Sequence, residues 1–368
     1  MADSSEHDTP SRIGYGGNTM NASNFSSAAL QKIAAEAARR SHAQAPPDRR
    51  KLPLRVGTRA SPLALVQTRH FLTRLTRFCP VLRDMGAFKE EQMQTSGDLN
   101  LKDRLAEIGG KGLFSKEIHE LLAVGGIDFA VHSLKDLETH LPPGLVLACT
   151  MKREDARDVL MLRKRGVTVD PERPFDCLPE GALVGCASVR RQAQMLHVRP
   201  DLRFTLLRGN VQTRLDKLGA GQCDATLLAY AGLKRLGMED RIDVPLSPEV
   251  MLPASGQGIV GVTVRESDHE LRELLSAIED PEARAVATAE RALLAELDGS
   301  CRTPIGGYAQ LKEGRLHLSG LVASEDGTFL LRRETEGLPE DAARLGYELA
   351  CELRRDTPPA IFAKIVQP

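Results

Sequence analysis

The sequence contains no tryptophan, only four tyrosines and almost no net charge. Lys and Arg together number 49, against 50 Asp and Glu, in 368 residues. Proteins that bind single-stranded nucleic acid stack bases on aromatic rings, and nucleic-acid binders in general present a basic surface. The sequence therefore disfavours a nucleic-acid partner. A small ligand with several negative charges, held by a local cationic patch, fits this balance better.

Long apolar runs and paired cysteine motifs are missing as well. No run approaches the roughly 18 apolar residues of a membrane-spanning helix, so we expect a soluble, cytoplasmic protein with no membrane partner. The seven Cys are odd in number and include no C-x-x-C pair. This argues against a zinc ribbon and against a disulfide framework. The nine His include no H-E-x-x-H motif, and we expect no metal site.

Length and changes of composition indicate several domains. We expect residues 1–52, which are polar and rich in small residues, to be a disordered extension. A transit peptide is the alternative, although the acidic residues near the start have the wrong charge for one. The remaining chain is expected to form domain 1 from residues 53–151 and 257–278, domain 2 from 157–253, and domain 3 from 281–368.

A short apolar run that ends in a charged pair is the first candidate for a site. Residues 127–136 read I-D-F-A-V-H-S-L-K-D after a turn-like Gly-Gly, which is typical of a buried parallel strand. Ligands bind beyond the carboxyl ends of strands in open α/β sheets, so we expect Lys135 and Asp136 at the mouth of a site. Asp136 is the candidate catalytic carboxylate. The alternative is that both residues only pair with neighbours or cap the next element.

Arg59 and Ser61 lie at another strand end. Residues 54–58 predict a strand and residues 63–75 an amphipathic helix, which places both side chains at a helix N-terminus. Free backbone N–H groups, the helix dipole and a guanidinium together favour a carboxylate or phosphate ligand. That Ser61 only caps the helix is an equally open interpretation.

Arginine also follows three later predicted strands, at residues 182–185, 204–207 and 225–229. A single Arg of this kind is usually solvated. Several unpaired guanidinium groups in one crevice repel each other, so we expect this set to hold an anion. The candidate residues after the first two strands are Ser188, Arg190, Arg191, Arg208 and Arg214.

Two glycine-rich stretches resemble nucleotide-binding motifs without meeting their requirements. Residues 109–112 read G-G-K-G but lack the phosphate-loop spacing and its hydroxyl residue, and we expect a mobile lid over residues 99–110 instead. Residues 256–261 spell G-x-G-x-x-G but lead into a predicted strand, not a helix. They are better explained as a hinge that returns the chain to the first domain.

The last part of the chain predicts a small α+β domain with a cysteine loop. Helices are expected at 283–296 and 341–354, and strands at 316–323 and 329–334. Cys301 lies in a loop rich in Gly, Ser and Pro, beside Arg302, which favours the thiolate. An inert buried thiol is the alternative.

Taken together, these motifs resemble the porphobilinogen deaminase (hydroxymethylbilane synthase) family. The resemblance covers residues from about 53 to the C-terminus. It rests on T-R-A-S-P-L-A-L, G-G-K-G-L-F, A-V-H-S-L-K-D, S-V-R-R-Q, L-R-G-N-V-Q-T-R-L, A-G-L-K-R-L-G and G-S-C-R-T-P-I-G, which occur in the family's order. It implies an α/β fold with two domains like type II periplasmic binding proteins and a small α+β C-terminal domain.

The resemblance also implies an activity. Members of the family are transferases that join four porphobilinogen molecules head to tail, with loss of ammonia, on a covalently bound dipyrromethane. Water then releases the linear tetrapyrrole hydroxymethylbilane, as part of haem biosynthesis. By similarity, Asp136 is the catalytic residue and Cys301 carries the dipyrromethane. The residues implied in binding cofactor or substrate are Arg59, Ser61, Ser133, Lys135, Ser188, Arg190, Arg191, Arg208 and Arg214.

The resemblance implies a monomer, and three positions depart from the family's pattern. Cys186-Ala187 stands where two hydroxyl residues are usual, Ser300 replaces a Gly before the Cys, and Leu137-Glu138 replaces a common Pro. The first departure removes hydrogen-bond partners worth about 1 kcal/mol each for a ligand carboxylate. The competing hypothesis is a non-catalytic anion-binding module, since a two-lobed fold alone supports only binding. Asp136 and Cys301 discriminate between the two.

Overall fold

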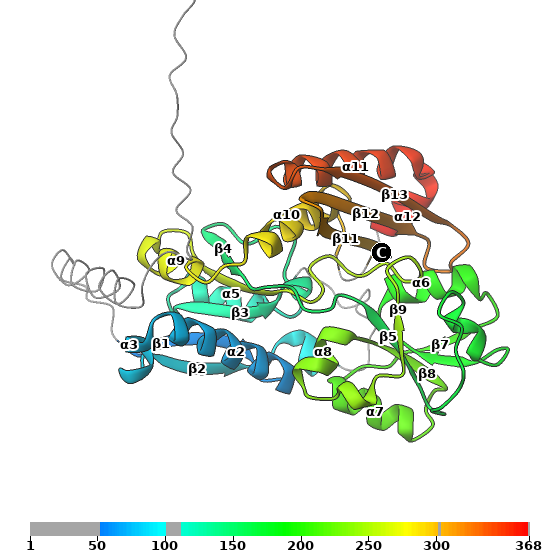
Figure 1. Cartoon of the computed structure of the whole chain (residues 1–368), viewed down its shortest axis with the longest axis horizontal. Coiled ribbons are helices and arrows are strands. Elements are labelled where there is room, and N and C mark those ends of the chain that lie inside the picture. Colours follow the sequence, from blue (N-terminus) through cyan, green and yellow to red (C-terminus); the bar gives the residue numbers. More distant parts are fainter. Residues whose placement is uncertain (1–51, 101–111, 301–302, 367–368) are drawn as a thin grey trace, which may run out of the picture. The chain divides into compact units, whose positions relative to one another are not determined.

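Three β-sheets organise the part of the chain that this computed structural model describes, which is residues 52–100, 112–300 and 303–366. The first and second sheets each have five strands, and the third has three. Helices pack against each of them (Figure 1). The predicted mixed α/β class, with two larger sheets and a small C-terminal one, is confirmed. The predicted extension and lid lie outside the described residues, except for residues 52, 99 and 100.

The first sheet has the strand order β2-β1-β3-β10-β4. The strands predicted at 54–58 and 127–136 are present, whereas the polar strand β2 was not predicted. Strand β3 runs parallel to β1, as its sequence indicated, whereas β10 pairs antiparallel with both β3 and β4. The chain enters β10 directly from the second sheet, with no crossover helix to reverse its direction. The strands are β1 (Leu54–Arg59), β2 (Phe88–Met93), β3 (Phe129–Ser133), β4 (Leu145–Thr150) and β10 (Val260–Arg265).

Helix α2 covers the first sheet with its apolar side. Phe71 and Leu75 on this helix are fully buried against Phe129 and Val262 of the sheet. Ser61 caps the helix and Pro62 opens it, a position where the missing proline N–H costs nothing. The helices of this part are α2 (Pro62–Phe78), α3 (Pro80–Asp84), α4 (Ser96–Leu99), α5 (Lys116–Ala123) and α9 (His269–Ser276).

The second sheet has the order β7-β6-β8-β5-β9 and contains the three predicted Arg-bearing strands. Strand β6 runs parallel to β7 and β8, so their carboxyl ends share one edge. Strand β5, between β8 and β9, pairs antiparallel with both and was not predicted. The elements are β5 (Asp158–Leu162), β6 (Leu183–Gly185), β7 (Arg203–Thr205), β8 (Ala225–Ala229), β9 (Val244–Leu246), α6 (Val189–Val198), α7 (Val211–Gly219) and α8 (Tyr230–Arg235).

The third sheet is an antiparallel meander, with helices α10 and α11 packed on it. Its first strand, β11, was not predicted and forms one edge. The outer side of β11 bonds to other parts of the protein: Gly307 N–H donates to Pro253 O, and Ala309 N–H donates to Glu290. The elements are α10 (Pro281–Glu296), β11 (Ile305–Lys312), β12 (Arg315–Ala323), β13 (Leu330–Gly337), α11 (Ala342–Asp356) and α12 (Pro359–Val366). Short 3-10 turns are η2 (Leu134–Asp136), η3 (Pro174–Cys177), η4 (Glu239–Arg241) and η5 (Pro339–Asp341).

Two segments connect the first and second sheets, and they lie side by side. Residues 151–157 lead from β4 to β5, and residues 247–259 lead from β9 to β10. Met151 N–H donates to Val260 O at 2.9 Å, and Glu154 N–H donates to Gly258 O at 3.0 Å. Gly258 has φ +87°, and a Cβ there would lie 2.4 Å from Glu154 O. The G-x-G-x-x-G glycines therefore serve a tight chain crossing, in agreement with their predicted place between the sheets.

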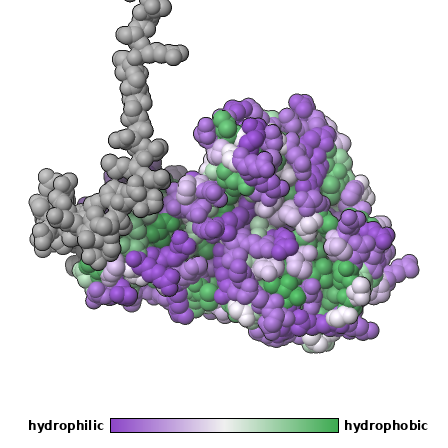
Figure 2. Space-filling model, viewed as in Figure 1, coloured by the Kyte–Doolittle hydropathy of each residue, from purple (hydrophilic) through white to green (hydrophobic). Residues whose placement is uncertain are grey.

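The described surface and interior give two further findings. On the face drawn in Figure 2, hydrophilic residues predominate and apolar ones form separate patches. Among the described helices, none combines the length and apolarity needed to cross a membrane. The same residues contain no cluster of His, Cys, Asp or Glu that could hold a metal ion.

Candidate functional site

Asp136 lies where strand β3 ends, as predicted. After Ser133 the chain turns through η2, and buried Leu134 anchors the turn by donating its N–H to Ile259 O on the neighbouring segment. The turn leaves Lys135 and Asp136 on the carboxyl side of the sheet. The Asp136 side chain remains 27% exposed, which is enough for a ligand to reach its carboxylate.

Arg59 holds the Asp136 carboxylate from the adjacent strand. Its Nη1 donates to Asp136 Oδ2 at 3.1 Å, and its Nε donates to Asp98 Oδ2 at 3.2 Å. The guanidinium also stacks on the ring of Phe114, 4.4 Å from the centroid. Burial raises the pKa of Asp98, but the bonds from Arg59 and Thr95 outweigh it and leave the pKa below the usual value. Arg59 therefore bridges two carboxylates, and its hydrogen bond orients the Asp136 side chain.

A chain of hydrogen bonds connects Lys135 to the second sheet. Lys135 Nζ donates to Gln257 Oε1 at 3.2 Å, and Gln257 Nε2 donates to Asp158 Oδ1 at 2.8 Å. Burial lowers the pKa of Lys135 to about 8, with Asp136 opposing the shift and Arg191 adding to it. Lys135 is a cation in a confined position that a ligand carboxylate would stabilise.

Arg190 and Arg191 are paired with Asp158, which corrects the expectation that the strand-end arginines are unpaired. Arg190 Nη2 bonds to Asp158 Oδ2 at 2.8 Å, and Arg191 Nη2 bonds to Oδ1 at 2.7 Å. All three residues are buried. Burial would raise the pKa of Asp158, yet the two guanidinium groups and Gln257 hold it far below its usual range. One carboxylate facing two guanidinium groups still leaves an excess positive charge.

Arg208 and Arg214 extend this excess. Arg208 is buried and donates to Gly97 O at 3.0 Å, so it reaches from the second sheet to helix α4 beside the first. Arg214 Nε donates to Gly209 O at 2.9 Å. Burial lowers the pKa of Arg214 to about 10, helped by Arg191 and Arg208 and opposed by Asp136. A cation whose charge is opposed by both burial and like charges is a place for an anionic ligand.

The three predicted serines take structural bonds. Ser61 Oγ accepts from Ala64 N–H at 3.4 Å, and Ser188 Oγ accepts from Arg191 N–H at 3.5 Å, so both cap helices. Ser61 thus caps the helix at whose N-terminus it was predicted to lie. Ser133 Oγ donates to Gln67 Oε1 at 3.0 Å. A hydroxyl that accepts from a backbone N–H keeps its hydrogen, so Ser61 and Ser188 can each still donate one bond to an anion.

Cys301 and Arg302 lie outside the described residues, but the stretch before them is placed. Thr139 Oγ1 donates to Gly299 O at 3.0 Å, and Arg291 on α10 donates to Glu138 O and Thr139 O. Residues 138–139 come two and three positions after Asp136. The stretch that leads into the Cys301 motif is thus joined to the turn that carries Asp136.

The described candidate residues form one site, in which cationic side chains outnumber carboxylates. Three residues of this group were not predicted: Asp98, Asp158 and Gln257. Asp158 gave a weak signal as a single charge before an apolar run; Gln257 and Asp98 gave none. The cationic side chains, which exceed the carboxylates Asp98, Asp136 and Asp158, are Arg59, Lys135, Arg190, Arg191, Arg208 and Arg214. Such a group fits a ligand with several carboxylates.

Comparisons with known proteins agree with this chemistry. Residues 54–273 match the family model "Porphobilinogen deaminase, dipyromethane cofactor binding domain", and residues 285–355 match "Porphobilinogen deaminase, C-terminal domain". The porphobilinogen deaminase of Nitrobacter winogradskyi is 48% identical over 300 residues, which are 81% of this chain and 92% of that protein. That of Synechococcus elongatus is 45% identical over 302 residues, or 82% and 92% of the two chains.

Solved structures with a related fold are more distant. The Bordetella pertussis BvgS VFT2 domain is 14% identical, covers 70% of this chain and 97% of its own, and superimposes with a TM-score of 0.39. That likeness is too remote to add to the argument. The two family models together span most of the chain, and the curated relatives match it along nearly their whole length. The chain belongs to the porphobilinogen deaminase family.

Proposed function

We propose that this protein is a porphobilinogen deaminase, which condenses four porphobilinogen molecules head to tail and releases hydroxymethylbilane. The observation that carries the proposal is the position of Asp136. It is an accessible carboxylate held by Arg59 at the edge of a group of buried cations. A plain anion-binding module needs the cations but has no use for a carboxylate that repels its ligand.

Asp136 is proposed to act on the positive charge that develops on the substrate. When ammonia leaves porphobilinogen, that charge spreads over the pyrrole ring and its N–H. A fixed carboxylate that accepts a hydrogen bond from this N–H stabilises the charge most where it develops. Arg59 prepares the geometry, since a carboxylate already oriented by its bond does not have to reorganise during the reaction.

The cationic residues are proposed to hold the acetate and propionate groups of the pyrroles. The guanidinium fork matches a carboxylate in two parallel bonds, and Asp158 keeps Arg190 and Arg191 in place before any ligand arrives. Arg59 and Ser61 are assigned to the incoming substrate. Residues assigned to the bound cofactor and chain are Ser133, Lys135, Ser188, Arg190, Arg191, Arg208 and Arg214.

A dipyrromethane on Cys301 fits the residues that the structure describes. Its carboxylates match the buried cations Lys135 and Arg214, whose charges burial disfavours. When bound, this group supplies the pyrrole position to which the first substrate is joined. The chain's own part is to grip its carboxylates and to keep Asp136 beside the reacting end.

The remaining assignments complete the proposal. Domain 1 comprises residues 53–151 and 257–278, domain 2 residues 157–253, and domain 3 residues 281–368. Displacement of these domains about residues 151–157 and 253–257 makes room for a lengthening chain. The protein is proposed to work as a monomer in the cytoplasm, without nucleic-acid or membrane partners.

The mass of the purified protein under reducing, denaturing conditions tests the assignment. A thioether, unlike a disulfide, survives reductant, so the wild type should carry the mass of one dipyrromethane and Cys301→Ala should not. Cys351→Ala, which removes another free thiol, is the matched control and should keep the adduct. A bare polypeptide mass in the wild type would favour the anion-binding module instead.

A further inference from the structure

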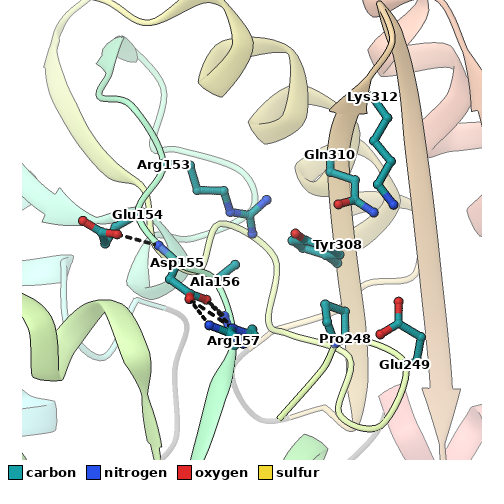
Figure 3. A pocket seen from close by; sticks show the side chains of 10 residues that line it. All are labelled: Arg153, Glu154, Asp155, Ala156, Arg157, Pro248, Glu249, Tyr308, Gln310 and Lys312. Carbon is teal, nitrogen blue, oxygen red and sulfur yellow. Dashed lines mark hydrogen bonds and ion pairs between the residues drawn. The ribbon is translucent and has the colours of Figure 1, made fainter. Parts of the chain in front are cut away.

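A cavity lies where three parts of the chain meet. It has a volume of about 450 Å³, within the range of small-molecule sites. One wall is the segment 153–157 between β4 and β5, another is Pro248–Glu249 after β9, and the third is strand β11 (Figure 3). None of the proposed catalytic or cofactor-binding residues lines it.

Strand β11 presents a row of polar side chains to this cavity. Tyr308, Gln310 and Lys312 alternate along the strand and therefore share one face. Within the described residues, the Tyr308 hydroxyl, the Gln310 carboxamide and the Lys312 ammonium form no hydrogen bonds. The cavity thus offers donors and acceptors that are not already used by the protein.

The opposite wall is rigid. Arg153 bonds to Glu290 at 2.5 Å, to Gln257 O at 2.8 Å and to Ala309 O at 3.0 Å. Its guanidinium lies over the Tyr308 ring, 4.8 Å from the centroid. A ligand therefore meets a preformed surface in which Arg153 is already neutralised.

The charges in the lining decide the class of ligand. Three basic residues face three acidic ones, and most are already paired: Arg157 with Asp155 at 2.7 Å, and Glu154 with Lys234 at 2.9 Å. The remaining opposite charges are Lys312 and Glu249. The pKa of Glu249 is lowered mainly by its own backbone N–H, then by a bond from Ser247 and by the charges of Arg332 and Lys312. In Figure 3, Lys312 and Gln310 extend to one end of the cavity and Glu249 to the other, with Tyr308 between them. A plain anion would meet Glu249, and a plain cation would meet Lys312.

We propose that this cavity binds a small zwitterion, an amino acid whose ammonium and carboxylate are separated by a short carbon chain. Lys312 and Gln310 bind the carboxylate, Glu249 binds the ammonium, and the Tyr308 hydroxyl adds a hydrogen bond. This site goes beyond the proposed function and does not rest on it. Two of its walls are segments that connect the first and second sheets, and the third is strand β11 of the third sheet, so an occupant bridges these segments and β11.

Calorimetric titration of the full-length protein with 4-aminobutyrate tests the proposal. Separate titrations with glycine and 6-aminohexanoate vary the distance between the ammonium and the carboxylate. At least one of these should bind, and butyrate and butylamine should bind at least tenfold more weakly. Lys312→Gln and Glu249→Gln should each weaken binding tenfold or more. Both side chains are exposed, so neither change should unfold the protein. Lys164→Gln, which changes an exposed Lys outside the cavity, should leave binding unchanged.

The swapped double variant, Lys312→Glu with Glu249→Lys, gives the sharpest outcome. It exchanges the charges at the two ends of the cavity. The single variants Lys312→Glu and Glu249→Lys should each lose binding of the zwitterion, and the double variant should regain it. Failure of all three amino acids to bind at 20 mM overturns the proposal. So does binding of butyrate as tight as that of 4-aminobutyrate, or binding that survives both single Gln variants.

Discussion

At the scale of one residue, a substitution of Asp136 can remove the charge of the side chain while keeping its shape. We expect Asp136→Asn to keep its place beside Arg59, because the amide matches the carboxylate in size, but to lose more than about 10²-fold in turnover. Ammonia release under saturating porphobilinogen is the measurement. Asp98→Asn removes the other carboxylate on Arg59 and should lower turnover far less. Near-normal turnover in Asp136→Asn would remove the role assigned here.

Substitution of Arg214 is expected to affect stability and function in opposite directions. Its side chain bonds to Gly209 O within the described residues, while burial lowers its pKa to about 10. Arg214→Leu should therefore unfold at an equal or higher urea concentration, since an unfavourable buried charge is gone. It should also stall elongation, seen as enzyme-bound intermediates in native mass spectra. Arg214→Lys should restore only part of the product, because Lys lacks the fork.

A matched control for Arg214 is Arg203→Leu. Arg203 also bonds to a single backbone carbonyl, that of Gly181 at 2.8 Å, but it is exposed. This variant should leave both the urea midpoint and the distribution of intermediates unchanged. An equal effect of the two variants would mean that Arg214 acts as an ordinary surface charge.

Sequence patterns place residues of this site only where local structure carries the signal. Lys135, Asp136 and the arginines follow strands, so the end of an apolar run locates them. The partners that hold them could not be found in this way. Asp158 meets Arg190 across 32 residues, and Lys135 meets Gln257 across 122. Nothing in a local pattern encodes such distant pairs, which is why the arginines were expected to be unpaired.

The same limit applies to whole elements. Strand β11 was hidden because it begins Ile-Gly-Gly, and glycines usually indicate a loop. Here a Cβ at Gly307 would lie 2.5 Å from Ser255 Oγ, so close packing requires the glycine within a strand. Strand β2 was missed because its four middle residues, 89–92, are all polar and resemble a solvated segment. It lies at the sheet edge, paired with β1.

Helix α5 and strand β3 meet at two buried histidines, His119 and His132, whose rings lie 5.4 Å apart. Both ring nitrogens of His119 are without hydrogen-bond partners in the described structure, and burial lowers its pKa to about 4. The unfolded chain, with an ordinary pKa near 6.5, binds this proton first as the pH falls. His119 therefore costs stability progressively from about pH 6.5 down to about pH 4.

We expect His119→Phe to remove this pH dependence while keeping a ring against His132. Between pH 7.5 and 5, the wild type should lose up to about 2 kcal/mol of unfolding free energy that the variant does not lose. Urea unfolding at the two pH values measures the difference. The control is His269→Phe, which changes an exposed His at the start of α9 and should behave as wild type. Parallel losses in both variants and wild type would assign the pH effect to other groups.

At the scale of the whole molecule, Glu290 and Arg153 connect the third sheet to the segments between the other two. Glu290 is fully buried and bonds to Arg153, Gly256 N–H and Ala309 N–H. Burial raises the pKa of Glu290, although Arg153 and both N–H groups oppose the shift. Breaking a buried pair by neutralising one partner leaves the other charge uncompensated.

Glu290→Gln is therefore expected to destabilise the protein by about 3 kcal/mol, measured as a lower urea midpoint. Glu282→Gln, an exposed position on the same helix α10, is the control and should change the midpoint little. Equal midpoints in the two variants would show that the buried pair contributes no net stability.

The pair of Glu290 and Arg153 also has a second role, at the edge strand β11. The strand lies at a sheet edge, where Ala309 N–H and C=O would otherwise face outward, and these two side chains bond to both groups. An uncovered edge strand is a template for pairing with another chain. The pair thus occupies the place of a neighbouring strand and keeps two protein molecules from joining sheet to sheet. Weakening it should appear as concentration-dependent aggregation, visible by light scattering before the protein unfolds.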